Sequence, residues 1–171
     1  MNEKQTSKFL SLILRHKPAT IGIELDQNGW AVVSELIEKM PISLDLLQKI
    51  VQEDNKGRYS FSEDLTKIRA NHGHSVDIDL GLVAVEPPEV LYHGTAAKSV
   101  PSIREKGLLP GTRQHVHLSS DTETATKVGQ RHGSPIVLAI STGDMSRDGF
   151  FFFKSENDVW LTTTVPSRYI R

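Results

Sequence analysis

The sequence predicts an α+β protein of two lobes, and three observations lead to this fold class. The segment before Lys56 carries helical patterns that precede a two-stranded hairpin. After residue 90, short strand and helix patterns alternate. Between these parts stands Glu86-Pro87-Pro88-Glu89, and consecutive prolines end helices and strands alike. We therefore divide the chain of 171 residues into one lobe of residues 1–85 and another of residues 86–171.

An apolar stripe predicts the first helix. A cap at Thr6 or Ser7 begins this helix, and Pro18 ends it. Residues that recur on one helical face make up the stripe, namely Phe9, Leu10, Leu12, Ile13 and Leu14.

Two further helices and a hairpin complete the first lobe. Residues 34–40 predict a short helix closed by Pro41, and Ser43 caps a third helix. Residues 58–61 and 67–71 predict the two strands of a hairpin with a polar turn between them. Helices followed by such a two-stranded wing are typical of a winged-helix module.

Strands alternate with helices in the second lobe. Gly107 stops the first of these helices, and Asp121 lies near the cap of the second. The expected helices cover residues 96–106 and 121–131. The expected strands cover residues 90–93, 115–118, 136–140, 150–153 and 159–161. This pattern predicts a mixed α/β lobe.

The composition is that of an ordinary globular protein, with 37% hydrophobic and 24% charged residues. No stretch approaches the roughly 18 apolar residues that span a bilayer, and the first residues lack the pattern of a secretion signal. The absence of cysteine excludes disulfides, thiolate catalysis and cysteine-based zinc sites. We therefore expect a cytoplasmic monomer without a membrane partner.

Three segments combine Arg or His with Gly, Pro or small hydroxyl residues. They are Leu14-Arg15-His16-Lys17-Pro18, the run from Arg69 to Ser75, and Leu91-Tyr92-His93-Gly94-Thr95. Arg offers a planar fork of donors that matches phosphate oxygens, and His exchanges a proton near neutral pH. The formal net charge is −1, so any affinity for nucleic acid must come from such local clusters. The three segments together predict an enzyme that acts on phosphorylated substrates.

Each segment also has a purely structural interpretation. Arg15 and His16 could complement a helix dipole, and Arg69 could be a solvated residue of the hairpin. Residues 92–95 could form a strand-to-helix turn, and residues 131–133 a helix C-cap with glycine.

Histidines two residues apart raise the question of a metal site. The pairs are His72 with His74 and His115 with His117, each on one face of a strand. No acidic or cysteine partner lies near either pair in the sequence, so we expect no metal.

Taken in order, several short strings resemble the KptA-type RNA 2′-phosphotransferases over about residues 7–170. They are Ser7-Lys8-Phe9-Leu10 leading into Leu14-Arg15-His16-Lys17-Pro18, Gly29-Trp30, Ile68-Arg69-Ala70, Gly73-His74-Ser75, Tyr92-His93-Gly94-Thr95, His115-Val116-His117-Leu118-Ser119, Arg131-His132-Gly133 and Val159-Trp160-Leu161-Thr162. The resemblance implies an N-terminal winged-helix RNA lobe and a C-terminal lobe of the ADP-ribosyltransferase fold, which binds NAD.

The resemblance also implies a reaction that requires NAD as co-substrate and no metal. An internal RNA 2′-phosphate attacks the ribose carbon that bears nicotinamide, which leaves RNA joined through phosphate to ADP-ribose. The ribose 2″-hydroxyl then attacks that phosphate. The products are nicotinamide, RNA with a free 2′-hydroxyl, and ADP-ribose 1″,2″-cyclic phosphate. A tRNA-like substrate in tRNA splicing or RNA repair is the implied partner.

Matching the family's motifs residue by residue assigns two sets of site residues. The catalytic set is Arg15, His16, Arg69 and Arg131, in which the arginines would clamp phosphate and His16 would stabilise it or relay a proton. The NAD-binding set is Tyr92, His93, Gly94, Thr95, His117, Ser119 and Val159, in which the backbone of Gly94 would meet the nicotinamide amide.

At three positions the sequence departs from the family's pattern. His72 replaces a usual Gln, and Leu65 and Asp158 stand where Gly is more common.

Two other functions remain open. The protein could ADP-ribosylate a terminal phosphate of RNA or DNA and stop there, or it could be a winged-helix regulator that senses NAD without turnover. The near-zero net charge counts against the regulator.

Overall fold

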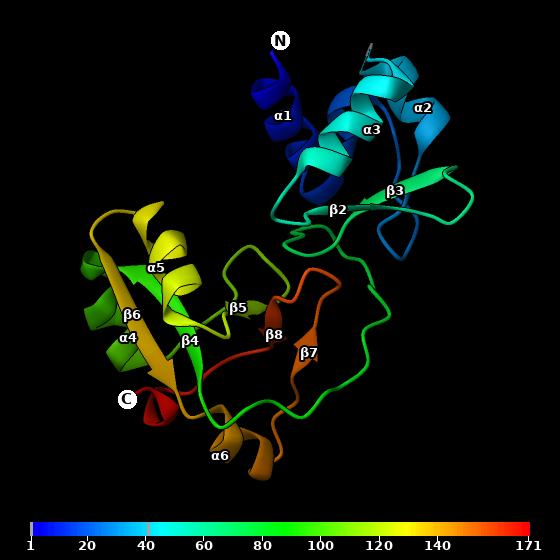
Figure 1. The fold of residues 1–171 in the computed structure, drawn as a ribbon. Helices are drawn as coiled ribbons and strands as arrows, with labels where there is room; N and C mark the ends of the chain where they lie inside the picture. The colour runs from blue at the N-terminus through cyan, green and yellow to red at the C-terminus, as the bar shows by residue number, and fades with distance from the viewer. Residues whose placement is uncertain (1, 41) are drawn as a thin grey trace. The chain divides into compact units, whose positions relative to one another are not determined.

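A computed structural model describes residues 2–40 and 42–171, and the chain forms two compact units (Figure 1). One unit extends to Gly81 and the other begins at Leu82. The architecture is α+β, since helices and small antiparallel sheets occur in both units. None of the helices in the described residues is long and apolar enough to cross a membrane.

The first unit combines helices with a three-stranded sheet. Its elements are α1 (Glu3–Arg15), the 3-10 helix η1 (Pro18–Ile21), β1 (Ala31–Val32), α2 (Val33–Lys39), α3 (Leu44–Glu53), β2 (Tyr59–Phe61) and β3 (Lys67–Ala70). The sheet has the order β1-β3-β2 with both pairs antiparallel. Ile68 of the central strand pairs with Ala31 on one side and Phe61 on the other.

Two of the predicted caps can be compared with the structure. The helix α1 begins four or five residues earlier than expected, because Asn2 accepts a bond from the Gln5 N–H while the Gln5 side chain accepts one from the Asn2 N–H. The cap predicted at Thr6 or Ser7 is therefore wrong. The cap at Ser43 is confirmed, since its hydroxyl accepts from the Leu46 N–H at 3.1 Å. The predicted closure at Pro41 lies outside the described residues.

Apolar faces of α1, α2 and α3 pack with β1, β2 and β3 to form the core of this unit. The core residues are Leu10, Ile13, Leu14, Ile23, Ala31, Val33, Leu36, Met40, Leu47, Ile50, Tyr59, Ile68 and Ala70. The phenol of Tyr59 donates to the Ser7 carbonyl at 2.9 Å and so satisfies its one polar group. The core thereby fixes the C-terminus of α1 against β3, the two elements that carry Arg15 and Arg69.

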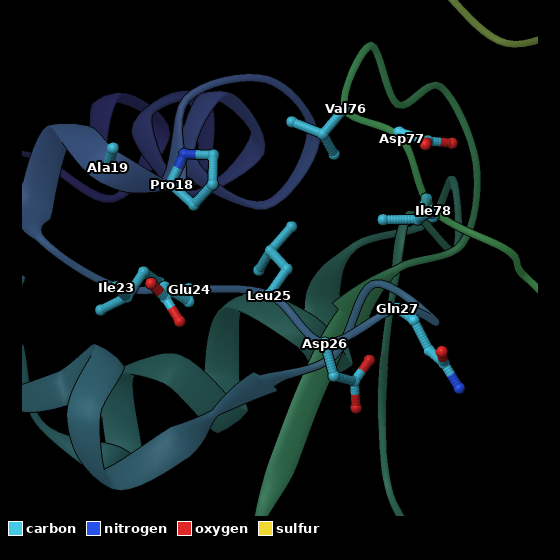
Figure 2. A pocket seen from close by; sticks show the side chains of 10 residues that line it. All are labelled: Pro18, Ala19, Ile23, Glu24, Leu25, Asp26, Gln27, Val76, Asp77 and Ile78. Atoms are coloured by element: carbon cyan, nitrogen blue, oxygen red, sulfur yellow. The ribbon is translucent and has the colours of Figure 1, made fainter.

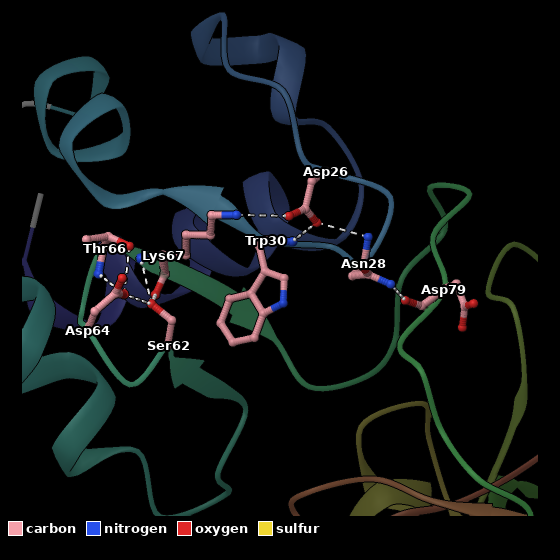
Figure 3. Close-up of polar contacts among 8 residues, drawn as sticks. All are labelled: Asp26, Asn28, Trp30, Ser62, Asp64, Thr66, Lys67 and Asp79. Atoms are coloured by element: carbon pink, nitrogen blue, oxygen red, sulfur yellow. Dashed lines mark hydrogen bonds and ion pairs between the residues drawn. The ribbon is translucent and has the colours of Figure 1, made fainter.

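The turn between β2 and β3 is organised by one carboxylate (Figure 3). Asp64 accepts from the hydroxyls of Ser62 and Thr66 and from the Thr66 N–H, and these bonds lower the pKa of Asp64 to about 2. Leu65 takes a φ of 61°, a conformation that favours glycine. The family's usual glycine at this position therefore has a backbone reason.

In the second unit, two small sheets are joined by helices and loops. Its elements are β4 (Leu91–Ala96), η2 (Ala97–Ser99), α4 (Val100–Lys106), β5 (Val116–Leu118), α5 (Thr122–Gln130), β6 (Pro135–Ile140), α6 (Thr142–Arg147), β7 (Phe153–Lys154), β8 (Trp160–Thr162) and η3 (Ser167–Tyr169). The strands β4 and β6 pair antiparallel, and a second antiparallel sheet has the order β5-β8-β7. An isolated bridge between Tyr92 and Ser119 links β4 to the residue after β5.

Most strands of this unit lie where the sequence predicts them, but one does not. The strand predicted over residues 150–153 is wrong, since strand geometry begins only at Phe153. Phe152 is instead buried in the core, while Phe151 is 68% exposed. The helix α6 is an element the sequence analysis missed.

Two glycines let α5 lie close on β4. A Cβ at Gly94 would stand 1.7 Å from the carbonyl oxygen of Ala125, and one at Gly129 would stand 2.7 Å from that of Thr95. No side chain fits in either place. The α5 helix, capped by Asp121, is thereby held against the strand that carries His93.

Candidate active site

Contacts with a distant segment of the same chain hold the C-terminus of α1 in place. The Nδ1 atom of His16 lies 2.9 Å from the Ser75 hydroxyl oxygen. The N–H groups of Ser75 and Val76 donate to the carbonyl of Arg15 at 2.9 and 3.4 Å. A helix leaves its last carbonyls without intrahelical partners, and here the loop after β3 supplies donors for one of them. Arg15 and His16 are thereby fixed to residues about sixty positions later in the chain.

Arg69 lies in β3, the central strand of its sheet, and its backbone position pairs with Ser60. Its guanidinium stands 4.5 Å from the centroid of the Trp30 ring, within cation–π range. The backbone of Trp30 is held in turn by Asp26, whose carboxylate accepts from the Trp30 backbone N–H at 3.0 Å and pairs with Lys67 (Figure 3). Arg69 is therefore an oriented residue rather than a freely solvated one.

His74 connects these residues electrostatically. Its ring is 1% exposed, and burial lowers its pKa to about 4, with further lowering by Arg15, His16 and Arg69. The structure therefore gathers three of the four predicted catalytic residues around one neutral imidazole. His74 was not among the predicted site residues, although it stands in the string Gly73-His74-Ser75 that carries the family resemblance.

A shallow cavity of about 330 Å³ adjoins this cluster along the chain (Figure 2). Pro18, Leu25 and Val76 point into it, whereas Gln27 and Asp77 point away from it. Carboxylates also stand around it, and they would repel a phosphate. The cavity is therefore unsuited to a phosphate.

His93 has a defined tautomer in the second unit. Its Nδ1 lies 3.0 Å from the carbonyl oxygen of His117, which can only accept, so Nδ1 carries the proton and Nε2 is an acceptor. Burial lowers the pKa of His93, the bond to His117 raises it, and nearby His132 lowers it, with a net lowering. His93 thus presents a neutral ring at pH 7.

His117 is oriented by a residue that the sequence analysis missed. The Nη1 of Arg113 donates to the Nδ1 of His117 at 3.2 Å, which places the proton of the neutral ring on Nε2. Burial and the positive charge of Arg131 lower the pKa of Arg113. Two guanidinium groups therefore lie within electrostatic range of each other beside His117. Sequence offered one signal, since Arg113 stands two residues before the string His115 to Ser119.

The remaining predicted NAD-binding residues have different surroundings. Tyr92 and Ser119 exchange two backbone hydrogen bonds of 2.8 and 2.7 Å. Gly94 and buried Thr95 lie where β4 meets α5, so Gly94 has a packing reason independent of any ligand. Val159 precedes β8 and exchanges bonds with Ser155, one residue beyond the register pair Leu118–Trp160.

One histidine pair follows β3, and the other lies at β5. Among the described residues, no group of three or more His, Asp and Glu side chains is arranged to hold one. The ring of His115 packs at 5.9 Å from that of Phe153, and burial lowers the pKa of His115.

Comparisons with known proteins point to one family. Residues 1–164 match the model of the RNA 2′-phosphotransferase, Tpt1 / KptA family. A protein of Flavobacterium johnsoniae is 53% identical over 99% of this chain and 98% of its own length. One of Fusobacterium nucleatum is 52% identical over 99% and 98%, and one of Acaryochloris marina is 50% identical over 97% and 94%. All three bear the name "Probable RNA 2′-phosphotransferase".

Proposed function

Because the chain belongs to the Tpt1 / KptA family of RNA 2′-phosphotransferases, we propose that it removes an internal 2′-phosphate from RNA by transferring it to NAD. The family resemblance predicted from short strings is confirmed, and membership supports RNA 2′-phosphotransferase activity. NAD as co-substrate and the two-step course are our proposal. The proposed products are 2′-hydroxyl RNA, nicotinamide and ADP-ribose 1″,2″-cyclic phosphate.

One observation carries the proposal, namely the gathering of Arg15, His16 and Arg69 around His74. All three influence the pKa of His74, and no carboxylate of the described residues contributes to that shift. A concentration of arginine and histidine side chains at one place favours an anion of more than one charge. A phosphate monoester is such an anion, and two arginine forks can accept its oxygens in pairs.

The role of His16 follows from its connection to Ser75. We propose that the Ser75 contact at Nδ1 orients the ring so that Nε2 faces the ligand. We propose that this Nε2 stabilises the phosphate and holds the proton that moves when a ribose hydroxyl attacks. Positioning and charge stabilisation are the main catalytic contributions in phosphoryl transfer, and we propose that this set supplies them without a metal.

We assign NAD to the second unit, and its residues fit the group. The Nε2 of His93 is an acceptor suited to a ribose hydroxyl, and the guanidinium groups of Arg113 and Arg131 suit a diphosphate. The other proposed contacts are Tyr92, Gly94, Thr95, His117, Ser119 and Val159. NAD supplies an electrophilic ribose carbon with nicotinamide as leaving group. Arg131 is the proposed fourth catalytic residue.

The finer fold assignments are also proposals. The order α1-β1-α2-α3-β2-β3 with the sheet β1-β3-β2 supports a winged-helix RNA lobe for residues 1–85. The paired sheets with α5 on β4 support an ADP-ribosyltransferase-like lobe for residues 86–171. We propose a cytoplasmic monomer that acts on a tRNA-like RNA in splicing or repair.

The test uses an oligoribonucleotide with one internal 2′-phosphate, incubated with the full chain, with and without NAD and with EDTA throughout. NAD-dependent formation of 2′-hydroxyl RNA and ADP-ribose cyclic phosphate is the expected result. A matched oligoribonucleotide with only a terminal 5′-phosphate is the control. Accumulation of ADP-ribosylated RNA on that control, without cyclic phosphate release, would replace the proposal with terminal ADP-ribosylation. Absence of any NAD turnover would refute both.

A further inference from the structure

The side chain of His74 is buried and polar, and the proposed reaction assigns it no role. Its ring is 1% exposed, and neither Nδ1 nor Nε2 has a hydrogen-bond partner within the described parts of the chain. Buried polar atoms are normally paired, since an unpaired one has lost its hydrogen bonds to water without replacement. An unpaired imidazole at this depth therefore requires an explanation.

The ring is held firmly by its surroundings. Gly29 has a φ of +86°, and a Cβ there would stand 3.3 Å from His74 Nε2 and 2.9 Å from the Cδ1 atom of Ile78. Only glycine is compatible with both the backbone conformation and this spacing. On the other side, Ser75 follows directly in the chain and contacts His16. The ring is thus placed by the same loop that orients the proposed phosphate site.

The charges that face His74 are all positive. Arg15 and His16 act on it from the end of α1, and Arg69 acts on it from β3. Within the described residues no carboxylate offsets them in the shift of its pKa, which falls to about 4. In the absence of a ligand, therefore, His74 is neutral at pH 7, because burial and the neighbouring positive charge disfavour the imidazolium form.

We propose that His74 is a positioning residue of the phosphate site, and that it takes up one proton from solution when a phosphate dianion binds to Arg15, His16 and Arg69. This inference rests on the proposed function, since it requires a phosphate monoester at those residues. Two negative charges reverse the electrostatic potential at the ring, which favours the imidazolium form. Protonation makes both ring nitrogens donors and adds a positive charge beneath the bound phosphate.

Proton uptake by His74 would distinguish a bound phosphate monoester from a bound phosphodiester. A 2′-phosphate monoester carries close to two negative charges at neutral pH, whereas each phosphodiester of the RNA backbone carries one. The diester therefore shifts the pKa of His74 by about half as much. An RNA without the 2′-phosphate would leave His74 neutral, so proton uptake becomes a specific response to the correct substrate.

Nitrogen-15 NMR of the full chain with labelled histidines tests this directly. RNA with one internal 2′-phosphate is added at pH 7 without NAD, so that no turnover occurs. We expect the His74 nitrogens to change from the neutral to the imidazolium pattern at saturation. The same RNA without the 2′-phosphate should cause no such change, and His115 in the second unit should stay neutral with both. A neutral His74 at saturation with the 2′-phosphorylated RNA overturns the inference.

Calorimetry in two buffers of different protonation enthalpy gives the number of protons taken up. The wild-type chain should take up about one proton more than His74→Gln, whose amide fills similar space without titrating. Equal uptake contradicts the inference. If His74→Gln does not fold, the NMR arm decides alone. NAD-dependent product formation tests the proposed function separately. Turnover together with an unchanged His74 would refute only the inference about His74. Absence of binding to the 2′-phosphorylated RNA would refute both the inference and the proposed function.

Discussion

His16 Nδ1 and the Ser75 hydroxyl oxygen lie 2.9 Å apart, although 59 positions separate the two residues in the chain. The contact joins the end of α1 to the loop that follows β3. The backbone reinforces it, because the Ser75 N–H donates to the Arg15 carbonyl. The loop therefore fixes the surroundings of Nδ1, one of the two ring nitrogens of His16.

Substituting Ser75 by Ala should lower the transfer rate without weakening RNA binding. The ring of His16 would lose its orientation, and one such hydrogen bond is worth about 0.5–1.5 kcal/mol, which corresponds to about a two- to tenfold decrease in kcat. Single-turnover kinetics with saturating RNA and NAD measure it. The control is Ser75→Thr, which keeps the hydroxyl. An unchanged kcat in Ser75→Ala would mean that this contact does not orient a catalytic group.

Arg69→Ala should reduce the transfer rate by about a hundredfold or more, because removing a donor to a developing anion costs that much in comparable sites. Arg69→Lys keeps the charge but loses the planar fork and the stacking on Trp30, so it should recover only part of the activity.

Trp30→Leu is the matched control for Arg69, since it removes the ring beneath the guanidinium and leaves Arg69 itself. Loss of a cation–π contact of about 0.5–1 kcal/mol predicts a several-fold decrease in kcat/KM. Full activity of Arg69→Ala would show that Arg69 is a structural residue of the sheet. Circular dichroism checks that all three variants fold.

Arg113→Gln should weaken NAD binding more than RNA binding. The variant loses a positive charge beside Arg131 and releases the Nδ1 of His117. We expect KM for NAD to rise about tenfold, because a charge-assisted hydrogen bond is worth about 1.5–3 kcal/mol. Isothermal titration with ADP-ribose measures the affinity directly. An equal loss of affinity for RNA would place Arg113 on the RNA side of the reaction.

Gly94→Ala should destabilise the second unit by about 3 kcal/mol or more, because its Cβ would stand 1.7 Å from the Ala125 carbonyl oxygen. Gly111→Ala is the control, since a Cβ there meets open space and only the φ of +64° opposes it. Thermal unfolding measures both. Similar melting temperatures for the two variants would contradict the close seating of α5.

Leu65→Gly should raise the free energy of unfolding by about 0.5 kcal/mol. A left-handed conformation costs a non-glycine residue about 1–2 kcal/mol, and glycine removes this cost. Glycine also gives the unfolded chain more conformational freedom, which offsets part of the stabilisation. Leu65 is 49% exposed, so little packing is lost. Leu65→Ala keeps the Cβ and should not stabilise. A chemical denaturation series distinguishes the two substitutions, and equal stability would contradict the argument.

Local patterns predicted most elements of the fold, and the errors have physical causes. The cap at Ser43 is a local contact and was found. The capping box of Asn2 and Gln5 was missed because the apolar stripe starts well after it. The strand β1 has two residues, too few to show an alternation. Phe152 and Phe153 take different environments that a run of identical side chains cannot distinguish.

The candidate site was predictable where a motif marked it and not where distant residues meet. Motifs pointed to Arg15, His16 and Arg69, but the Ser75 contact to His16 bridges distant parts of the chain. The neutral state of His74 depends on burial and on three cations from two elements. The sequence analysis assigned no role to Arg113, and its bond to His117 is seen only in the folded chain. The left-handed φ of 63° at Asp158 likewise explains the family's usual glycine only after folding.

The absence of side chains at Gly94 and Gly129 affects how substitution screens should be interpreted. His93 lies in β4, and Arg131 is the C-cap residue of α5. The distance between β4 and α5 therefore determines how far apart His93 and Arg131 stand. An alanine at either glycine would push α5, and with it Arg131, away from β4. A screen that scores activity alone would therefore not separate a loss of this spacing from a loss of a ligand contact.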